Sequence, residues 1–313
     1  MKKIYMAPME GVTDSIFRNT FREYYGGVDK YFTPFISPND TKKFTTREYK
    51  DIDPEKNNIQ TTVPQLITGK SEHFIWAMNE IYKLGFREIN FNLGCPSGTV
   101  VAKKKGSGLL YYPEDLDALL YDVFEAKPSD LNISIKTRLG KLDPEEFYEI
   151  LDIYNKYQIS ELTIHPRIQK DFYRERVRRD FFDYAVENTS LPLIYNGDLK
   201  SVNQVVDCLN QYPEIEGVML GRGLIANPTL ALACKNPKEE YAFDKKTFGD
   251  FHQRLLDSYV EVLSGQVPVL HRMKEFWVYW QENFSGSEKS IKTIKKAKSL
   301  AEYKGAVAQI LSK

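Results

Sequence analysis

The 313-residue chain is poor in cysteine, and its three cysteines form neither a metal-binding nor a disulfide pattern. Cys95, Cys208 and Cys234 lie far apart, whereas zinc ligands recur at short, fixed spacings. An odd number of scattered thiols is typical of a reducing compartment. We therefore expect a cytoplasmic protein that binds no metal.

Long hydrophobic runs and net charge are also missing. No stretch of about 18 uninterrupted apolar residues occurs, and residues 1–6 carry two lysines with no apolar segment behind them. We expect neither a membrane span nor an export signal. The 43 basic and 43 acidic residues cancel, so an anionic partner must be bound by local clusters of charge.

Eight short runs rich in β-branched and aromatic residues recur along the chain, and each ends at a polar or glycine-containing turn. They span residues 4–7, 30–35, 62–67, 88–93, 132–135, 161–164, 191–195 and 217–220. Helical patterns fill most of the gaps, over residues 15–24, 73–84, 113–126, 144–157, 179–187 and 201–209. Eight such units predict a (β/α)8 TIM barrel. A doubly wound open sheet is the alternative, but it does not explain polar residues after nearly every strand.

The composition changes after residue 228, and the rest of the chain has helical patterns over residues 248–263, 269–284, 288–298 and 301–311. Leu270, Met273, Trp277 and Trp280 fall at helical spacing, and we interpret this stripe as packing surface. The sequence thus predicts a catalytic barrel over residues 1–238 and a small helical domain over residues 239–313.

Cys95 stands on a tight turn directly after the predicted strand 88–93. Gly94 tolerates unusual dihedrals and Pro96 fixes φ, so the thiol is held in place. Most free cysteines are small buried apolar side chains, which is the alternative interpretation. Because the turns after barrel strands carry the catalytic groups, we favour a functional thiol.

Two glycine-containing triplets follow the last two predicted strands. They are Asn196-Gly197-Asp198 and Gly221-Arg222-Gly223. Barrels commonly bind phosphate with these loops, where glycine lets backbone N–H groups approach the anion. Each triplet alone could be a surface turn, but together they predict a phosphate site.

Lys136 and His165 directly follow two neighbouring predicted strands, so both side chains would point into the barrel mouth. Singly, each could be a solvated lysine or a structural histidine. Beside a cofactor with a phosphate tail, they could stabilise the negative charge that a flavin gains on reduction, and Gln65 could add a neutral hydrogen bond.

Three basic clusters occur, at residues 103–105, 167–179 and 289–298. Each alone could be a solvated surface. Together they favour an RNA partner, whose backbone requires local positive charge.

Six motifs resemble, in order and spacing, those of the tRNA-dihydrouridine synthases. They are residues 7–14 (APMEGVTD), 92–97 (NLGCPS), 136–140 (KTRLG), His165, 196–198 (NGD) and 221–223 (GRG). The resemblance resumes at residues 272–277 (RMKEFW), and Met9-Glu10-Gly11 is most similar to members that act early in the D-loop.

The resemblance implies an FMN-dependent barrel that reduces the C5–C6 double bond of uridine in the D-loop of tRNA, with NADPH as reductant. It implies that Cys95 protonates C5 while flavin N5 delivers hydride to C6. The implied cofactor contacts are Pro8, Met9, Glu10, Gln65, Lys136, His165, Asn196, Gly197, Asp198, Gly221 and Arg222.

The expected partners are tRNA, which the helical domain over residues 239–313 would bind, and NADPH, and we expect a monomer. The predicted tRNA contacts are Asn92, at the target base, and Lys103, Lys104, Lys105, Arg138, Arg167, Arg174, Arg176, Arg272 and Lys274. Two alternatives remain. An FMN enzyme acting on a free pyrimidine, as in dihydroorotate oxidation, would share the flavin residues, and a non-catalytic tRNA-binding protein would need no Cys95.

Overall fold

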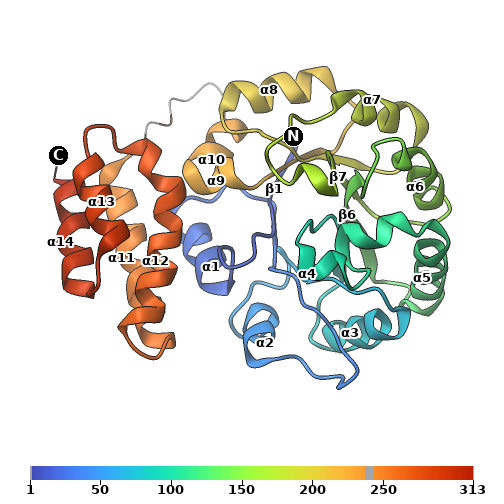
Figure 1. The fold of residues 1–313 in the computed structure, drawn as a ribbon, viewed down its shortest axis with the longest axis horizontal. Coiled ribbons are helices and arrows are strands. Elements are labelled where there is room, and N and C mark those ends of the chain that lie inside the picture. The colour runs from blue at the N-terminus through green and yellow to red at the C-terminus, as the bar shows by residue number, and fades with distance from the viewer. Residues whose placement is uncertain (1, 237–240, 242, 313) are drawn as a thin grey trace.

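The computed structural model describes residues 2–236, 241 and 243–312, and its first part is a ring of parallel strands surrounded by helices (Figure 1). The strands are β1 (Lys3–Met6), β2 (Lys30–Phe32), β3 (Thr62–Val63), β4 (Gln65–Leu66), β5 (Glu88–Leu93), β6 (Asn132–Gly140), β7 (Leu162–Ile168), β8 (Leu193–Tyr195) and β9 (Gly217–Leu220). The domain boundary that we expect between residues 238 and 239 lies outside the described residues.

The sheet closes at Pro64. The strand order is β3-β2-β1-β9-β8-β7-β6-β5-β4, and its two end strands are consecutive in the chain. A single residue, Pro64, separates β3 from β4. It interrupts the strand because proline has no N–H to donate to the ladder. The Pro64 carbonyl still accepts from the Asn90 N–H on β5 at 2.8 Å. The predicted TIM barrel is therefore confirmed, and the doubly wound open sheet is wrong.

Strands β6 and β7 run further than predicted. The sequence criterion ended them at the first polar residue, after residues 135 and 164, whereas they continue to Gly140 and Ile168. Pairing continues because the polar residues alternate with apolar ones, with Arg138 opposite His165 in the register. The charged side chains of this extension face into the barrel, which brings them to its mouth.

A cluster of paired charges lies at the N-terminal end of the barrel. The Lys30 ammonium is 2.6 Å from carboxylate oxygens of both Glu88 and Glu161. Lys3 lies 3.0 Å from Glu161, and the Tyr5 hydroxyl donates to the same carboxylate at 2.5 Å. Every charge of this N-terminal cluster (Lys3, Lys30, Glu88 and Glu161) thus has an opposite partner.

The outer helices follow the predicted order. They are α1 (Ser15–Tyr24), α3 (Ser71–Lys83), α5 (Pro113–Ala126), α6 (Glu146–Tyr154), α7 (Arg179–Asn188) and α8 (Val202–Gln211). Shorter elements that the sequence analysis did not predict lie mostly in loops, namely α2 (Thr46–Ile52), α4 (Gly98–Val101), the 3₁₀ turn η1 (Gly106–Tyr111), α9 (Arg222–Ala226) and α10 (Leu230–Lys235). These elements are too short to show a helical period.

The C-terminal helices form a bundle beside α1 (Figure 1). They are α11 (Lys245–Val262), α12 (Gln266–Trp280), α13 (Glu288–Lys296) and α14 (Leu300–Leu311). The predicted packing stripe from Leu270 to Trp280 is buried. The rings of Phe17 on α1 and Phe276 on α12 stack at 5.1 Å, which joins the bundle to the barrel. Within the described residues, no helix has the length and apolar character to cross a membrane.

Candidate active site

A cavity of about 370 Å³ opens at the C-terminal ends of the strands, within the size range of small-molecule sites. Loops from both halves of the barrel line it. The predicted residues in its wall are Pro8, Met9, Glu10, Gln65, Asn92, Cys95, Lys136, Arg138, His165, Asn196, Gly197, Asp198, Gly221 and Arg222. The structure thus brings together every residue that we predict to contact the cofactor, together with the proposed catalytic thiol.

The Cys95 turn is held from both sides. The Asn92 side-chain oxygen accepts from the N–H groups of Gly94 and Cys95, at 3.0 and 2.9 Å. The Ser107 hydroxyl donates to the Cys95 carbonyl at 2.8 Å. Gly106 packs beneath the turn, where an added Cβ would lie 2.9 Å from the Cys95 carbonyl oxygen. Burial raises the pKa of the Cys95 thiol, so it is protonated at neutral pH.

Lys136 lies in the same cavity without a counter-charge. No described residue accepts a hydrogen bond from its ammonium or forms an ion pair with it. Burial, together with the positive charge of Arg138, lowers the pKa of Lys136 to about 7. A partly desolvated cation of this kind is stabilised by any ligand that brings negative charge to it.

His165 is a neutral hydrogen-bond donor and not a second cation. The Arg167 guanidinium can only donate, so the His165 Nε2 atom, 2.8 Å away, accepts and the proton resides on Nδ1. Burial and the nearby arginine and lysine charges hold the pKa of His165 well below its ordinary value. Our expectation that Lys136 and His165 act as a pair is thus refined, because one residue supplies charge and the other a neutral N–H.

The expected phosphate end of the cavity combines two arginines with one carboxylate. Asp198 lies 2.5 Å from Arg167 and 3.0 Å from Arg222. A carboxylate repels phosphate, so Asp198 can contribute only its backbone N–H and the orientation of these two arginines. The first-turn N–H groups of α9, from Arg222 and Gly223, have no acceptor within their helix. Asn196 donates to the Met219 carbonyl at 2.8 Å and holds β8 to β9.

Arg138 holds the loop that follows β7. Its guanidinium is buried and donates to the carbonyls of Ile168 and Phe172, at 2.8 and 2.7 Å. Phe172 has a φ of 48°, a backbone conformation that is unfavourable for residues other than glycine. The next residue, Tyr173, lines the cavity, with its ring centroid 5.3 Å from Arg138 and 4.9 Å from Arg222. Tyr173 belongs to the basic cluster at residues 167–179, and its place in the cavity wall was not predicted.

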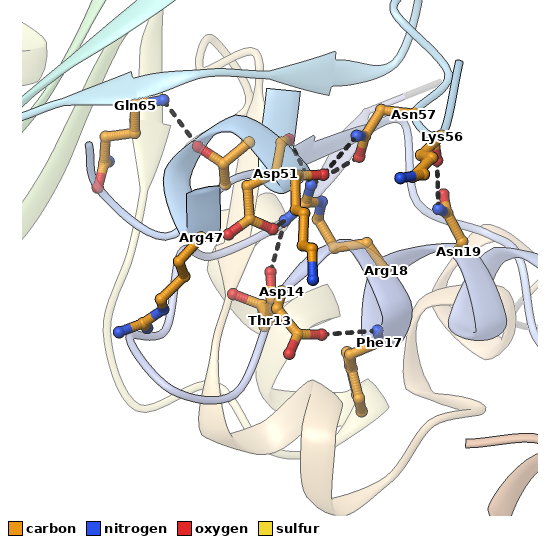
Figure 2. Close-up of polar contacts among 12 residues, drawn as sticks. Thr13, Asp14, Phe17, Arg18, Asn19, Arg47, Asp51, Lys56, Asn57 and Gln65 are labelled. Carbon is orange, nitrogen blue, oxygen red and sulfur yellow. Dashed lines mark hydrogen bonds and ion pairs between the residues drawn. The ribbon is translucent and has the colours of Figure 1, made fainter. Parts of the chain in front are cut away.

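The loop after β1 forms the opposite wall and is held by a buried arginine (Figure 2). Arg18 donates to the Thr13 carbonyl at 2.7 Å, to the Asp51 carboxylate at 3.0 Å and to the Asn57 side chain at 2.8 Å. The Thr13 hydroxyl in turn accepts from the Met9 N–H at 2.8 Å. These bonds fix the wall that contains the predicted residues Pro8 to Glu10.

The C-terminal bundle also contributes to the cavity, through Glu275 and Tyr279 on α12. An added Cβ on Gly11 would lie 3.2 Å from a Glu275 carboxylate oxygen, so the loop and α12 are in close contact. The motif at residues 272–277 was the available signal for this contribution. The sequence alone did not reveal that it faces the barrel mouth.

The predicted tRNA contacts fall into two groups. Lys103, Arg174 and Arg176 are exposed, on loops after β5 and β7. Lys104 pairs with Asp115 at 3.1 Å, Lys105 donates to the Ser37 hydroxyl at 2.9 Å, and Arg272 lies 3.8 Å from Asp14. Arg138 and Arg167 point inward, and Lys274 donates to the Ala297 carbonyl. No RNA contact is tested by these positions, so the assignments stay predictions.

Comparisons with known proteins agree with the geometry. The family model described as "Dihydrouridine synthase (Dus)" matches residues 5–312. The tRNA-dihydrouridine(16) synthase of Vibrio vulnificus (strain CMCP6) is 29% identical over 243 residues, 75% of each chain. The probable tRNA-dihydrouridine synthase of Staphylococcus aureus (strain COL) is 30% identical over 287 residues, 87% of this chain and 83% of the relative.

Solved structures share the fold at low identity. Morphinone reductase in complex with tetrahydroNAD superposes with a TM-score of 0.54 over 79% of this chain and 90% of that chain, at 12% identity. The described residues contain no group of three or more histidine, cysteine, aspartate or glutamate side chains placed to hold a metal ion.

Proposed function

The chain belongs to the dihydrouridine synthase family, and on this basis we propose that it reduces the C5–C6 double bond of a uridine in the D-loop of tRNA. One observation supports this most directly. A protonated thiol, an unpaired lysine and a neutral histidine N–H line a single cavity, on a fold whose catalytic groups lie at this face.

The donor set of the cavity fits FMN. Lys136 has no counter-charge, and the buried Arg138 Nε atom has no acceptor, so the cavity has more donors and positive charge than its own residues satisfy. Lys136, His165 and Gln65 would hold the ring, and Gly197, Gly221, Arg222 and the first-turn N–H groups of α9 would hold the phosphate. When bound, FMN would supply the hydride for C6 of the uracil ring, with NADPH as the reductant.

Cys95 supplies the proton for C5. Its raised pKa keeps the thiol protonated, and the capped turn holds the sulfur at a fixed place in the cavity wall. Lys136 carries the positive charge that favours a reduced, anionic ring beside it. Glu10, Met9 and Pro8 form the wall opposite, held by Arg18.

The tRNA backbone would contact exposed basic residues around the cavity mouth. Lys103, Arg174 and Arg176 have no partner among the described side chains and lie on loops at the same end of the barrel. We propose that the protein acts in the cytoplasm as a monomer. The name of the Vibrio relative, which specifies position 16, supports a target early in the D-loop.

The test is direct. Purified protein should be yellow, release FMN on denaturation, and form dihydrouridine in tRNA taken from a strain that lacks it. Mapping the modified position would identify the target uridine. A colourless protein, or one that reduces orotate or free uracil faster than tRNA, would favour the non-catalytic or free-pyrimidine alternatives.

A further inference from the structure

A continuous chain of side-chain hydrogen bonds crosses the barrel interior and ends at the Cys95 turn. We call Glu88, Ser134, Asn90, Gln65 and Asn92 the amide relay. The Ser134 hydroxyl donates to Glu88 at 3.0 Å, Asn90 to Ser134 at 3.0 Å, Gln65 to Asn90 at 2.7 Å and Asn92 to Gln65 at 2.7 Å. The Asn92 oxygen then accepts the N–H groups of the turn.

The direction of the amide relay is fixed at the Cys95 turn. Backbone N–H groups can only donate, so the Asn92 oxygen must face them and its nitrogen must face Gln65. The Gln65 nitrogen must then face the Asn90 oxygen, and the Asn90 nitrogen must face Ser134. The three amides therefore have one consistent orientation. The Ser134 hydroxyl, which accepts from Asn90, donates to Glu88.

Three members of the amide relay, Glu88, Asn90 and Ser134, do not reach the cavity. Gln65 and Asn92 line the cavity, whereas Asn90 and Ser134 do not, and both of these are fully buried. Any influence of Asn90 or Ser134 on the reaction must therefore pass through Gln65 and Asn92. The side-chain nitrogens of Gln65 and Asn92 each use one N–H within the relay and keep a second, so each still offers a hydrogen-bond donor.

We propose that Asn90 and Ser134 are positioning residues, which hold the Gln65 and Asn92 amides in one orientation and thereby fix the Cys95 turn. The proposal rests on the function proposed above. Without the Asn90 acceptor, the Gln65 amide can rotate by half a turn, and its nitrogen then faces the Asn92 nitrogen. Asn92 loses its acceptor and no longer caps the turn securely.

The test compares two substitutions at one position. Asn90→Leu removes both hydrogen bonds at similar size, whereas Asn90→Asp keeps an acceptor for Gln65 and for the Ser134 hydroxyl. We expect Asn90→Leu to lower tRNA reduction by about 100-fold, as small displacements of catalytic groups do. FMN should remain bound through Lys136, His165 and the phosphate loops, with a smaller loss of affinity from the rotated Gln65 amide, so tRNA reduction is expressed per bound FMN. Asn90→Asp should restore tRNA reduction to within a few fold of wild type.

Alkylation of Cys95 by iodoacetamide gives a readout that does not depend on tRNA. The rate is followed against pH by mass spectrometry of the Cys95 peptide, with Cys95→Ala as the blank. In Asn90→Leu the freed turn should expose the thiol, so that alkylation is faster and the pKa obtained from its pH profile falls toward the ordinary value. Asn90→Asp should retain the wild-type profile.

Thr137→Val is the matched control. Thr137 lies on the same strand as Ser134 and is also buried, but its hydroxyl contacts the Tyr154 hydroxyl on the outer face at 2.9 Å. Ser134→Ala should reduce tRNA reduction less than Asn90→Leu and more than Thr137→Val, and it carries the test if Asn90→Leu does not fold.

The outcomes separate the two proposals. If Asn90→Leu and Ser134→Ala are less stable but retain wild-type tRNA reduction and the wild-type alkylation profile, the amide relay is only structural and the inference is overturned. If wild-type protein does not reduce tRNA, the proposed function fails, and the alkylation profiles still decide whether the relay fixes the turn.

Discussion

The two ends of the barrel hold their lysine side chains in opposite ways. At the N-terminal end, Lys30 lies between Glu88 and Glu161, and each cation of the cluster has a carboxylate within 3.0 Å. At the C-terminal end, Lys136 has no carboxylate partner, and burial lowers its pKa to about 7. Paired cations stabilise the fold, whereas an unpaired cation gains its partner when a ligand binds. The missing counter-charge therefore marks the functional end.

The thiol at the C-terminal end should have the largest effect on function. Cys95→Ala removes only the proposed proton donor, so dihydrouridine formation should fall by about 10²–10⁴-fold, the usual contribution of a general acid. FMN content and flavin reduction by NADPH should be retained. Single-turnover assays with tRNA measure the effect, and near-normal turnover would contradict the assignment.

Breaking the N-terminal pairing should cost stability and leave the chemistry intact. Glu161→Gln removes a buried carboxylate from Lys3 and Lys30. Because these lysines are partly exposed and keep Glu216 and Glu88 as partners, the cost should be about 1–3 kcal/mol, below that of leaving a buried charge unpaired. Urea unfolding at pH 7 measures this cost. Dihydrouridine formation per folded molecule should stay at the wild-type level, and a selective loss of activity would refute the division between the two ends.

The pH dependence of the free energy of unfolding tests the pairing of Glu161 at the N-terminal end. Burial alone would raise the pKa of Glu161, but Lys30, Tyr5 and Lys3 outweigh burial and lower it. The Glu161 contribution is therefore complete above the ordinary glutamate pKa of about 4.3 and is lost as the pH falls below that value. The stability difference between wild type and Glu161→Gln should shrink as the pH falls from 5 toward 3. A constant difference would show that the pairing is not electrostatic.

Removing the unpaired cation should change the flavin more than the fold. Lys136→Met removes a positive charge beside the ring, so the midpoint potential of the bound flavin should fall by roughly 30–60 mV, at about 1.4 kcal/mol per 30 mV. Unfolding free energy should change little or rise, because a buried charge without a partner is lost. Potentiometric titration measures the shift, and an unchanged potential at full FMN occupancy would exclude the role given to Lys136.

The smallest expected effect concerns exposed charge. The logarithm of tRNA affinity should fall with the logarithm of salt concentration. Neutralising Lys103, Arg174 or Arg176 should make this fall shallower, by roughly 0.7–0.9 in slope for each phosphate contact that is lost. Lys83→Ala is the control, because Lys83 is exposed at the end of α3, just before the N-terminal end of β5. Equal effects of Lys83 and Arg174 would mean that tRNA does not prefer the cavity face.

The sequence predicted the barrel and the wall of the cavity because both depend on local order along the chain. Short apolar runs ending at polar turns identify the strands, and all such turns after barrel strands meet at one face. Cys95, Lys136 and the two glycine triplets could therefore be placed in one site without a structure.

The partners of each polar side chain could not be predicted in this way. Sequence shows the charge of Arg138 and Arg167 but not their direction. Both donate to groups inside the protein, and their assignment as RNA contacts stays a prediction. His165 looked like a cation until Arg167 identified its acceptor nitrogen. Glu275 lines the cavity because helix α12, which comes late in the sequence, packs beside the barrel mouth. No local sequence pattern predicts that packing.

Asp14 has a consequence for how the enzyme selects its target. It caps α1 at the Phe17 N–H, accepts from Tyr259 of the bundle at 2.8 Å, and follows the cavity-lining loop directly. Asp14 therefore joins the bundle to the cavity wall, in addition to the stacked rings of Phe17 and Phe276. If the bundle binds tRNA as predicted, this connection would fix the position of the bound RNA relative to the cavity that contains Cys95.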